Sequence, residues 1–88
     1  MSERKDLRIE VSLVEDDAHT EATATISIGG TDYAASGLAR RNPADPNVPT
    51  IGEELATARA LSDLSHELVD AATKSLEDHL GRPVTIEG

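Results

Sequence analysis

Apolar side chains recur at spacings of three and four from Ile51 to Leu80, which is the period of one long amphipathic helix. Thr50 followed by Glu53 predicts a capping box at its start, with negative charge at the positive end of the helix dipole. Gly81 suits the position just after the last turn, and Pro83 prevents continuation. At 1.5 Å per residue this helix is roughly 45 Å long, so the remainder of the chain must supply what it packs against.

Three segments before the helix alternate between apolar and polar residues, as strands with one solvated face do. They run from Leu7 to Leu13, from Thr20 to Ile28 and from Thr31 to Ala39. Gly29 and Gly30 separate the last two segments and predict a tight hairpin turn, because both central positions of such a turn need positive φ. The expected fold is therefore α+β, a three-stranded antiparallel meander packed against one long C-terminal helix.

The core must be built mainly from aliphatic residues, many of them small. The chain contains no Cys, Phe or Trp, and Tyr33 is its one aromatic residue. The run Ala34 to Gly37 would let the helix or another backbone approach the third strand closely. Without Cys there is neither a disulfide framework nor a thiolate metal site. With 88 residues we expect one domain, residues 7–88, after a disordered tail of residues 1–6.

Between the last strand and the helix, residues 40–50 read as a loop with a proline at every third position. That spacing fits an extended, polyproline-II-like segment that crosses from sheet to helix. Turn-forming residues dominate it, which favours a structural role for the loop and helix start. These residues are Asn42, Pro43, Asp45, Pro49 and Gly52. We expect Arg59 to tie the helix to this loop.

The length of the helix predicts a second subunit. Strands of about eight residues reach only about 27 Å, so the helix should extend past its own sheet. Its apolar positions nevertheless continue to the last turn, through Leu68, Leu76 and Leu80. An exposed stripe of this kind is unusual in a monomer, and a C2 homodimer is the simplest cover. Val84 and Ile86 give the C-terminal tail strand character, so it is a candidate to join the partner's sheet edge.

The charge of the chain argues against nucleic acid. Eight Lys and Arg stand against seventeen Asp and Glu, a formal net charge of −9, which repels phosphates on average. The candidate residues for contact with RNA or another partner are Arg40, Arg41 and Arg59. For the Arg40–Arg41 pair, anchoring of the loop is the alternative.

Catalytic patterns are absent from the sequence, which favours a non-enzymatic protein without cofactor or metal. Ser36 lacks the glycine pattern of a nucleophile elbow. The three histidines are scattered, and none pairs with another at the spacing of a helical metal site. One helical face collects Asp63, His66, Glu67 and Asp70. That face could hold a divalent cation, but a solvated polar surface opposite the leucines is the favoured interpretation.

No apolar run approaches the length of about 18 residues that a membrane span needs. The first residues also lack the apolar stretch of a signal peptide. We therefore expect a cytoplasmic protein.

The stretch from Gly37 to Leu64 reads GLARRNPADPNVPTIGEELATARALSDL. It resembles the signature of an actinobacterial family of small proteins of unknown function with a double-stranded-RNA-binding-like fold. A mycobacterial member of that family is induced in dormancy and is similar, as a dimer, to ribosome hibernation promoting factors. The resemblance implies a dimeric stress or dormancy protein, and action on translation is one mode of action that it suggests.

Two interpretations therefore remain open. In the first, the protein is a homodimeric regulatory or interaction module that binds another protein. In the second, it is a ribosome- or RNA-binding hibernation-type regulator that uses Arg40, Arg41 and Arg59 against an unfavourable overall charge.

Overall fold

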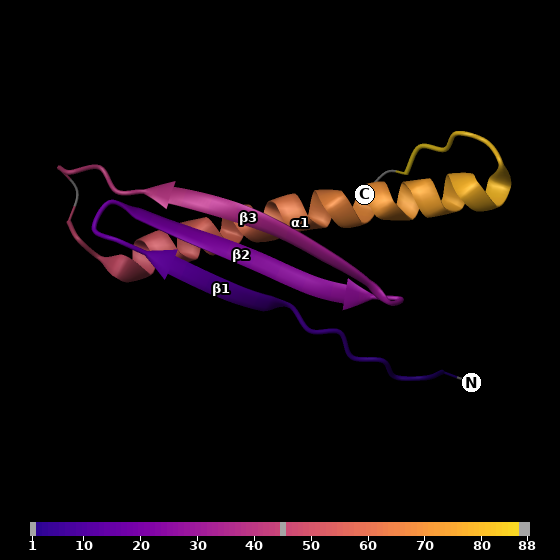
Figure 1. Ribbon diagram of the computed structural model, residues 1–88, viewed down its shortest axis with the longest axis horizontal. Coiled ribbons are helices and arrows are strands. Elements are labelled where there is room, and N and C mark those ends of the chain that lie inside the picture. The colour runs from indigo at the N-terminus through magenta and orange to yellow at the C-terminus, as the bar shows by residue number, and fades with distance from the viewer. Residues whose placement is uncertain (1, 45, 87–88) are drawn as a thin grey trace.

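The computed structural model describes residues 2–44 and 46–86, and within them three strands precede one helix (Figure 1). Their bounds are β1 (Glu10–Glu15), β2 (His19–Ile28), β3 (Thr31–Arg40) and α1 (Pro49–Leu80). This order confirms the predicted α+β class. The likeness to the double-stranded-RNA-binding fold stays a prediction.

The strands form an antiparallel meander in the order β1-β2-β3. Gly29 and Gly30 take φ of 57° and 80°, and Ile28 lies opposite Thr31, so the predicted hairpin turn is confirmed. Because side chains alternate along each strand, one face of the sheet carries the alanines of β2 and their cross-strand partners.

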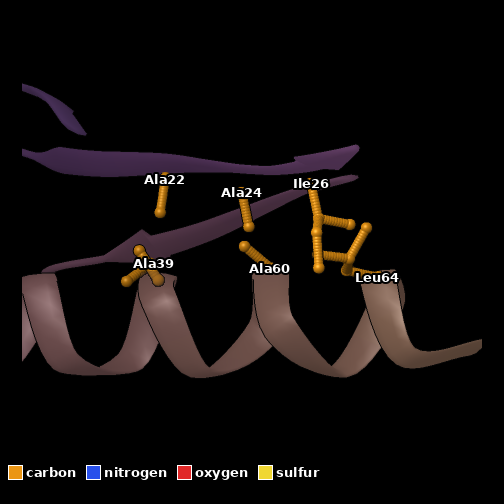
Figure 2. Packing of buried hydrophobic residues seen from close by; sticks show 7 residues of the cluster. Ala22, Ala24, Ile26, Ala39, Ala60 and Leu64 are labelled. Carbon is orange, nitrogen blue, oxygen red and sulfur yellow. The ribbon is translucent and has the colours of Figure 1, made fainter. Parts of the chain in front are cut away.

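Helix α1 covers that face over β2 and β3 (Figure 1). The buried apolar cluster lies between them, and Figure 2 shows Ile26 of β2 meeting Leu64 of α1. Five of the seven buried residues are alanines, as the shortage of large apolar residues predicts: the full set is Ala22, Ala24, Ile26, Ala39, Ala56, Ala60 and Leu64.

Two glycines set how closely α1 approaches the sheet. A Cβ on Gly37 would collide with the carbonyl oxygen of Ala56 and the amide nitrogen of Ala60. A Cβ on Gly52 would lie 2.8 Å from the Oγ1 atom of Thr20. The prediction that small residues in the third strand admit the helix is therefore confirmed at Gly37.

The helix extends beyond its own sheet (Figure 1). The molecule measures 53 × 30 × 19 Å, and its radius of gyration is 16.9 Å, against about 12 Å for a compact chain of this length. Along α1, Leu64 is the last buried residue and Leu68 is half-buried against the core. The twelve residues from Val69 to Leu80 follow without a buried side chain, which confirms the predicted overhang.

The predicted start of the helix is wrong. Pro49 is its first residue and Val48, with φ −116° and ψ 97°, is the N-cap without a side-chain hydrogen bond. Pro49 has no N–H to lose and its fixed φ suits the first helical position, so the chain turns before Thr50 can act as cap. Glu53 consequently lies beyond the first turn. The predicted loop ends at Val48, and it is not extended throughout, because residues 43 and 44 form a turn and the Val48 N–H donates to the Pro46 carbonyl oxygen at 3.0 Å. At the other end, Gly81 at φ 67° is the C-cap, as predicted.

The first strand and the tail also differ from expectation. β1 begins at Glu10 rather than Leu7, although the alternation reaches back further. Residues 82–86 form no strand, and the Val84 N–H donates to Glu77 Oε2 at 2.9 Å, which turns the tail back along α1 (Figure 1). Within the described residues, no helix combines the length and apolarity that crossing a bilayer requires.

Candidate interaction surface

The side of α1 that faces away from the sheet carries a second apolar stripe. Its large members are all exposed, between 37% for Val69 and 54% for Ile51. Small residues fill the stretch between its two bulky ends. We call this set the outer stripe: Ile51, Leu55, Ala58, Ser62, Ser65, Val69, Ala72, Leu76 and Leu80. Successive members lie three or four positions apart, so they share one side of the helix.

Acidic residues of α1 avoid this stripe. The helix contains seven: Glu53, Glu54, Asp63, Glu67, Asp70, Glu77 and Asp78. At 3.6 residues per turn, only Glu54 lies directly beside the outer stripe, while the other six lie on the flanks or towards the sheet. Glu77 moreover accepts the Val84 N–H. The outer stripe is thus close to neutral on a protein of net charge −9.

A second apolar area lies on β1. Val11 and Leu13 pair with Ala24 and Ala22, so their side chains point to the helix side of the sheet. Helix α1 packs on β2 and β3, however, and Leu13 keeps 40% of its surface exposed. Ile9, just before the strand, is 49% exposed.

A pocket of about 460 Å³ opens where the β1–β2 turn, the end of β3 and the start of α1 meet. The turn is held by Asp16, whose Oδ1 accepts the N–H groups of Ala18 and His19 at 2.8 Å each. These backbone hydrogen bonds lower the pKa of Asp16, and the His19 ring lies 3.3 Å from the same oxygen. Arg41 donates from Nε to the carbonyl oxygen of Asp17 at 3.1 Å. The pocket wall is therefore built largely by local turn contacts.

Two carboxyl groups meet beside this pocket. A hydrogen bond between Glu15, at the end of β1, and Glu53 of α1 raises the pKa of Glu15, with smaller contributions from burial and from the negative charge of Glu53. A hydrogen bond from Thr20 acts in the opposite direction.

The three predicted arginines lie near the end of β3 and make different contacts. Arg40 and Arg41 line the pocket, and the backbone N–H of Arg41 donates to the Ala18 carbonyl oxygen at 2.9 Å. The described hydrogen bond of Arg59 is to a strand rather than to the loop. Arg59 Nη1 donates to the carbonyl oxygen of Leu38 at 2.6 Å and so joins α1 to β3.

The residues of the predicted loop motif have different structural roles. Asn42 Oδ1 accepts the Ala44 N–H at 3.0 Å, which closes a turn beside Pro43. Pro49 starts the helix and Gly52 admits Thr20. Asp45 lies outside the described residues.

Of the predicted interface residues, Leu76 and Leu80 belong to the outer stripe and are 40% and 49% exposed. Leu68 instead packs against the core, and Val84 and Ile86 are half-buried. The sequence-based list missed Ile51, Leu55 and Val69 as outward residues, although their heptad-like spacing was the signal for them.

The polar face with Asp63, His66, Glu67 and Asp70 assembles no cation site. Within residues 2–44 and 46–86, no three His, Asp or Glu side chains gather closely enough to hold a metal ion. That face is solvated.

Comparison with known proteins places these features in a family. Residues 5–85 match the family model described as Rv2632c-like. The uncharacterized protein Rv2632c of Mycobacterium tuberculosis is 43% identical over 81 residues, which cover 92% of this chain and 87% of that protein. The uncharacterized protein Mb1767 of Mycobacterium bovis is 38% identical over 78 residues, 89% and 83% of the two chains. The crystal structure of Rv2632c superposes with a TM-score of 0.84 at 40% identity, covering 93% of this chain and 98% of that one.

Proposed function

The chain belongs to the Rv2632c-like family, and from that premise we propose that it is a non-enzymatic regulatory or interaction protein that works as a cytoplasmic homodimer. The observation that carries the proposal is the amount of surface left uncovered. A folded monomer of 9.3 kDa exposes about 5,000 Å², whereas this protein exposes 6937 Å². The excess of about 1,900 Å² is more than the roughly 800 Å² that each partner contributes to a standard interface.

The composition of the pocket supports a non-enzymatic role. His19 and Asp16 form the kind of pair that can activate a nucleophile, yet the pocket lining contains neither Ser nor Cys. Thr20, which is buried there, directs its hydroxyl oxygen towards Gly52.

Light scattering coupled to size exclusion tests the dimer directly. At micromolar concentration we expect a mass near twice 9.3 kDa. Measurement of 9.3 kDa throughout the range from 1 to about 100 µM would remove the homodimer, and with it the proposed mode of action.

The accumulation of the protein under stress or dormancy is the finer part of the proposal, and the likeness of residues 37–64 to the family signature supports it. Quantitative immunoblotting of growing and non-growing cultures of the source organism tests it. We expect a several-fold rise on growth arrest, and a constant level would contradict the stress role without touching the dimer.

Ribosome or RNA binding has less support. Arg41 and Arg59 donate to backbone oxygens of their own chain, and the net charge is −9. Ribosome co-sedimentation over a salt series separates the two interpretations. Phosphate contacts predict association that weakens steeply as salt rises, whereas the interaction module predicts none.

A further inference from the structure

We propose that the outer stripe of α1 pairs with the outer stripe of a second copy, the two helices running antiparallel about a two-fold axis between Ser62 and Ser65. This inference rests on the proposed homodimer and specifies which face forms it and in which direction. Figure 1 shows α1 lying along the sheet for its N-terminal half and extending past it for its C-terminal half, where the tail of residues 82–86 turns back beside the helix. The large side chains of the outer stripe remain exposed in both halves.

The sizes of the side chains along the outer stripe allow it to pack against a reversed copy of itself. Bulky residues stand at both ends and small residues in the middle. Antiparallel pairing around Ser62 and Ser65 then sets each large side chain from Ile51 to Leu76 against a residue of the partner's stripe. Ile51 meets the partner's Leu76, Leu55 meets the partner's Ala72, and Ala58 meets the partner's Val69. These positions alternate at spacings of four and three, the seam of a two-helix coiled coil. The small central residues let the helix axes come close.

Two arguments favour antiparallel over parallel helices: the position of the sheet that supports each helix, and the interaction between the helix dipoles. In the antiparallel pair, the overhanging half of each helix, with Val69 and Leu76, rests on the half of the partner that its own sheet holds in place. The helix dipoles then oppose each other, which is the favourable arrangement. A parallel pair would align the dipoles, stack Glu54 on its own copy and leave both overhanging halves supported only by one another.

Charge explains why this face accepts a second copy. Two protomers of net charge −9 repel each other, and this repulsion is weakest where few acidic side chains lie at the contact. Glu54 lies beside the stripe on one side, and the other border carries Arg59, His66 and Glu77, whose carboxylate accepts the Val84 N–H. The occupant is therefore a second copy of the same near-neutral stripe, whereas a strongly basic partner would find few acids there to bind. The 32-residue helix is about 48 Å long, and the uncovered excess of surface exceeds what a standard interface requires.

Single cysteines test the geometry, because the chain has none of its own. Ser62→Cys and Ser65→Cys place a thiol near the axis, so each variant should give a disulfide-linked dimer in high yield on mild oxidation. Ser75→Cys is the matched control on the same helix, since its copy would lie more than 30 Å away in the antiparallel pair. An equimolar mixture of Ile51→Cys and Leu76→Cys should form the mixed dimer in preference to either self-linked one.

A charge substitution checks the face in the unmodified assembly. Leu76→Glu should weaken dimerisation at least tenfold, whereas Lys74→Glu, a larger charge change off the stripe, should leave most of it. A dimer by mass whose Ser62→Cys and Ser65→Cys variants do not cross-link would overturn the inference and leave the homodimer standing. Self-linking of Ile51→Cys in place of mixed linking overturns the antiparallel direction. A monomer by mass overturns the homodimer as well.

Discussion

Gly37 sits where β3 passes beneath α1, and any Cβ there meets backbone atoms of Ala56 and Ala60, which no rotamer change can move. We expect Gly37→Ala to lower the free energy of unfolding by about 1–3 kcal/mol, measured by urea denaturation monitored by circular dichroism. Gly52→Ala is the matched control. It meets the rotatable hydroxyl of Thr20 and recovers up to about 1 kcal/mol of helix propensity, so its net effect should be smaller. Equal losses in both variants would contradict the role assigned to Gly37.

Glu15 predicts a pH dependence with a defined sign. Its pKa is raised in the folded protein, chiefly by the hydrogen bond with Glu53, so between the ordinary pKa and the raised one the folded state binds more protons than the unfolded state. Stability should therefore fall as pH rises from the ordinary carboxyl range through the raised pKa. Glu15→Gln removes this effect and should be more stable than the parent at pH 7, with the gain vanishing below pH 4. Urea midpoints at the two pH values measure it. A difference between the two proteins that does not change with pH would contradict the raised pKa of Glu15.

The residue types predicted much of the composition of the core, but not which residues distant in sequence come into contact. The lack of Phe and Trp predicts an alanine-rich core, and the small residues near Gly37 predict a close approach of the helix. Gly52 was assigned to a turn-rich loop motif, because nothing in its neighbourhood shows that Thr20 of β2 lies against it. The meeting of Glu15 with Glu53 was missed for the same reason. Such contacts join residues far apart in the chain, and local patterns do not report them.

At the scale of elements, the start of α1 offers a stabilising substitution. Val48 occupies the N-cap and provides no side-chain acceptor for the free N–H groups of the first turn. We expect Val48→Ser to raise the free energy of unfolding by about 0.5–1 kcal/mol. Thr50→Ala should change it by less than about 0.5 kcal/mol, because Thr50 lies inside the helix. Thermal and urea unfolding would show the ranking. A large loss in Thr50→Ala with no gain in Val48→Ser would restore the capping box.

The helical period predicted the helix correctly, but it did not distinguish the apolar residues that face the sheet from those that face solvent. Leu64 and Leu68 belong to the side that packs on the sheet, whereas Leu55, Leu76 and Leu80 point away from it. Spacings of three and four are compatible with both sides, and only the position of the sheet separates them. Likewise, alternation from Leu7 shows which side chains can share a face, while hydrogen bonding to β2 decides that the strand begins at Glu10. Existence and order of elements were therefore predictable, and their limits and solvent faces were not.

At the scale of the molecule, shape and charge act against each other. The elongated form, with a radius of gyration of 16.9 Å, leaves apolar surface that association would cover. The net charge of −9 on each copy opposes that association at every site except where acids are sparse. Salt should therefore tighten the homodimer by screening the repulsion, whereas it would loosen any contact with phosphates. The sign of the salt dependence thus reports which kind of partner the protein binds.

Concentration provides the matching test of stability. If folding and dimerisation are coupled, the thermal midpoint rises with protein concentration by mass action. For two 88-residue chains with about 0.7 kcal/mol of unfolding enthalpy per residue, a hundredfold increase in concentration should raise the midpoint by roughly 5–10 °C. Leu76→Glu, which places a charge on the outer stripe, should flatten this dependence, and Lys74→Glu should retain it. Calorimetry from about 5 to 500 µM measures the slope. A midpoint that stays constant in the parent protein would mean that each chain is stable by itself, and the alanine-rich core would then suffice without a second copy.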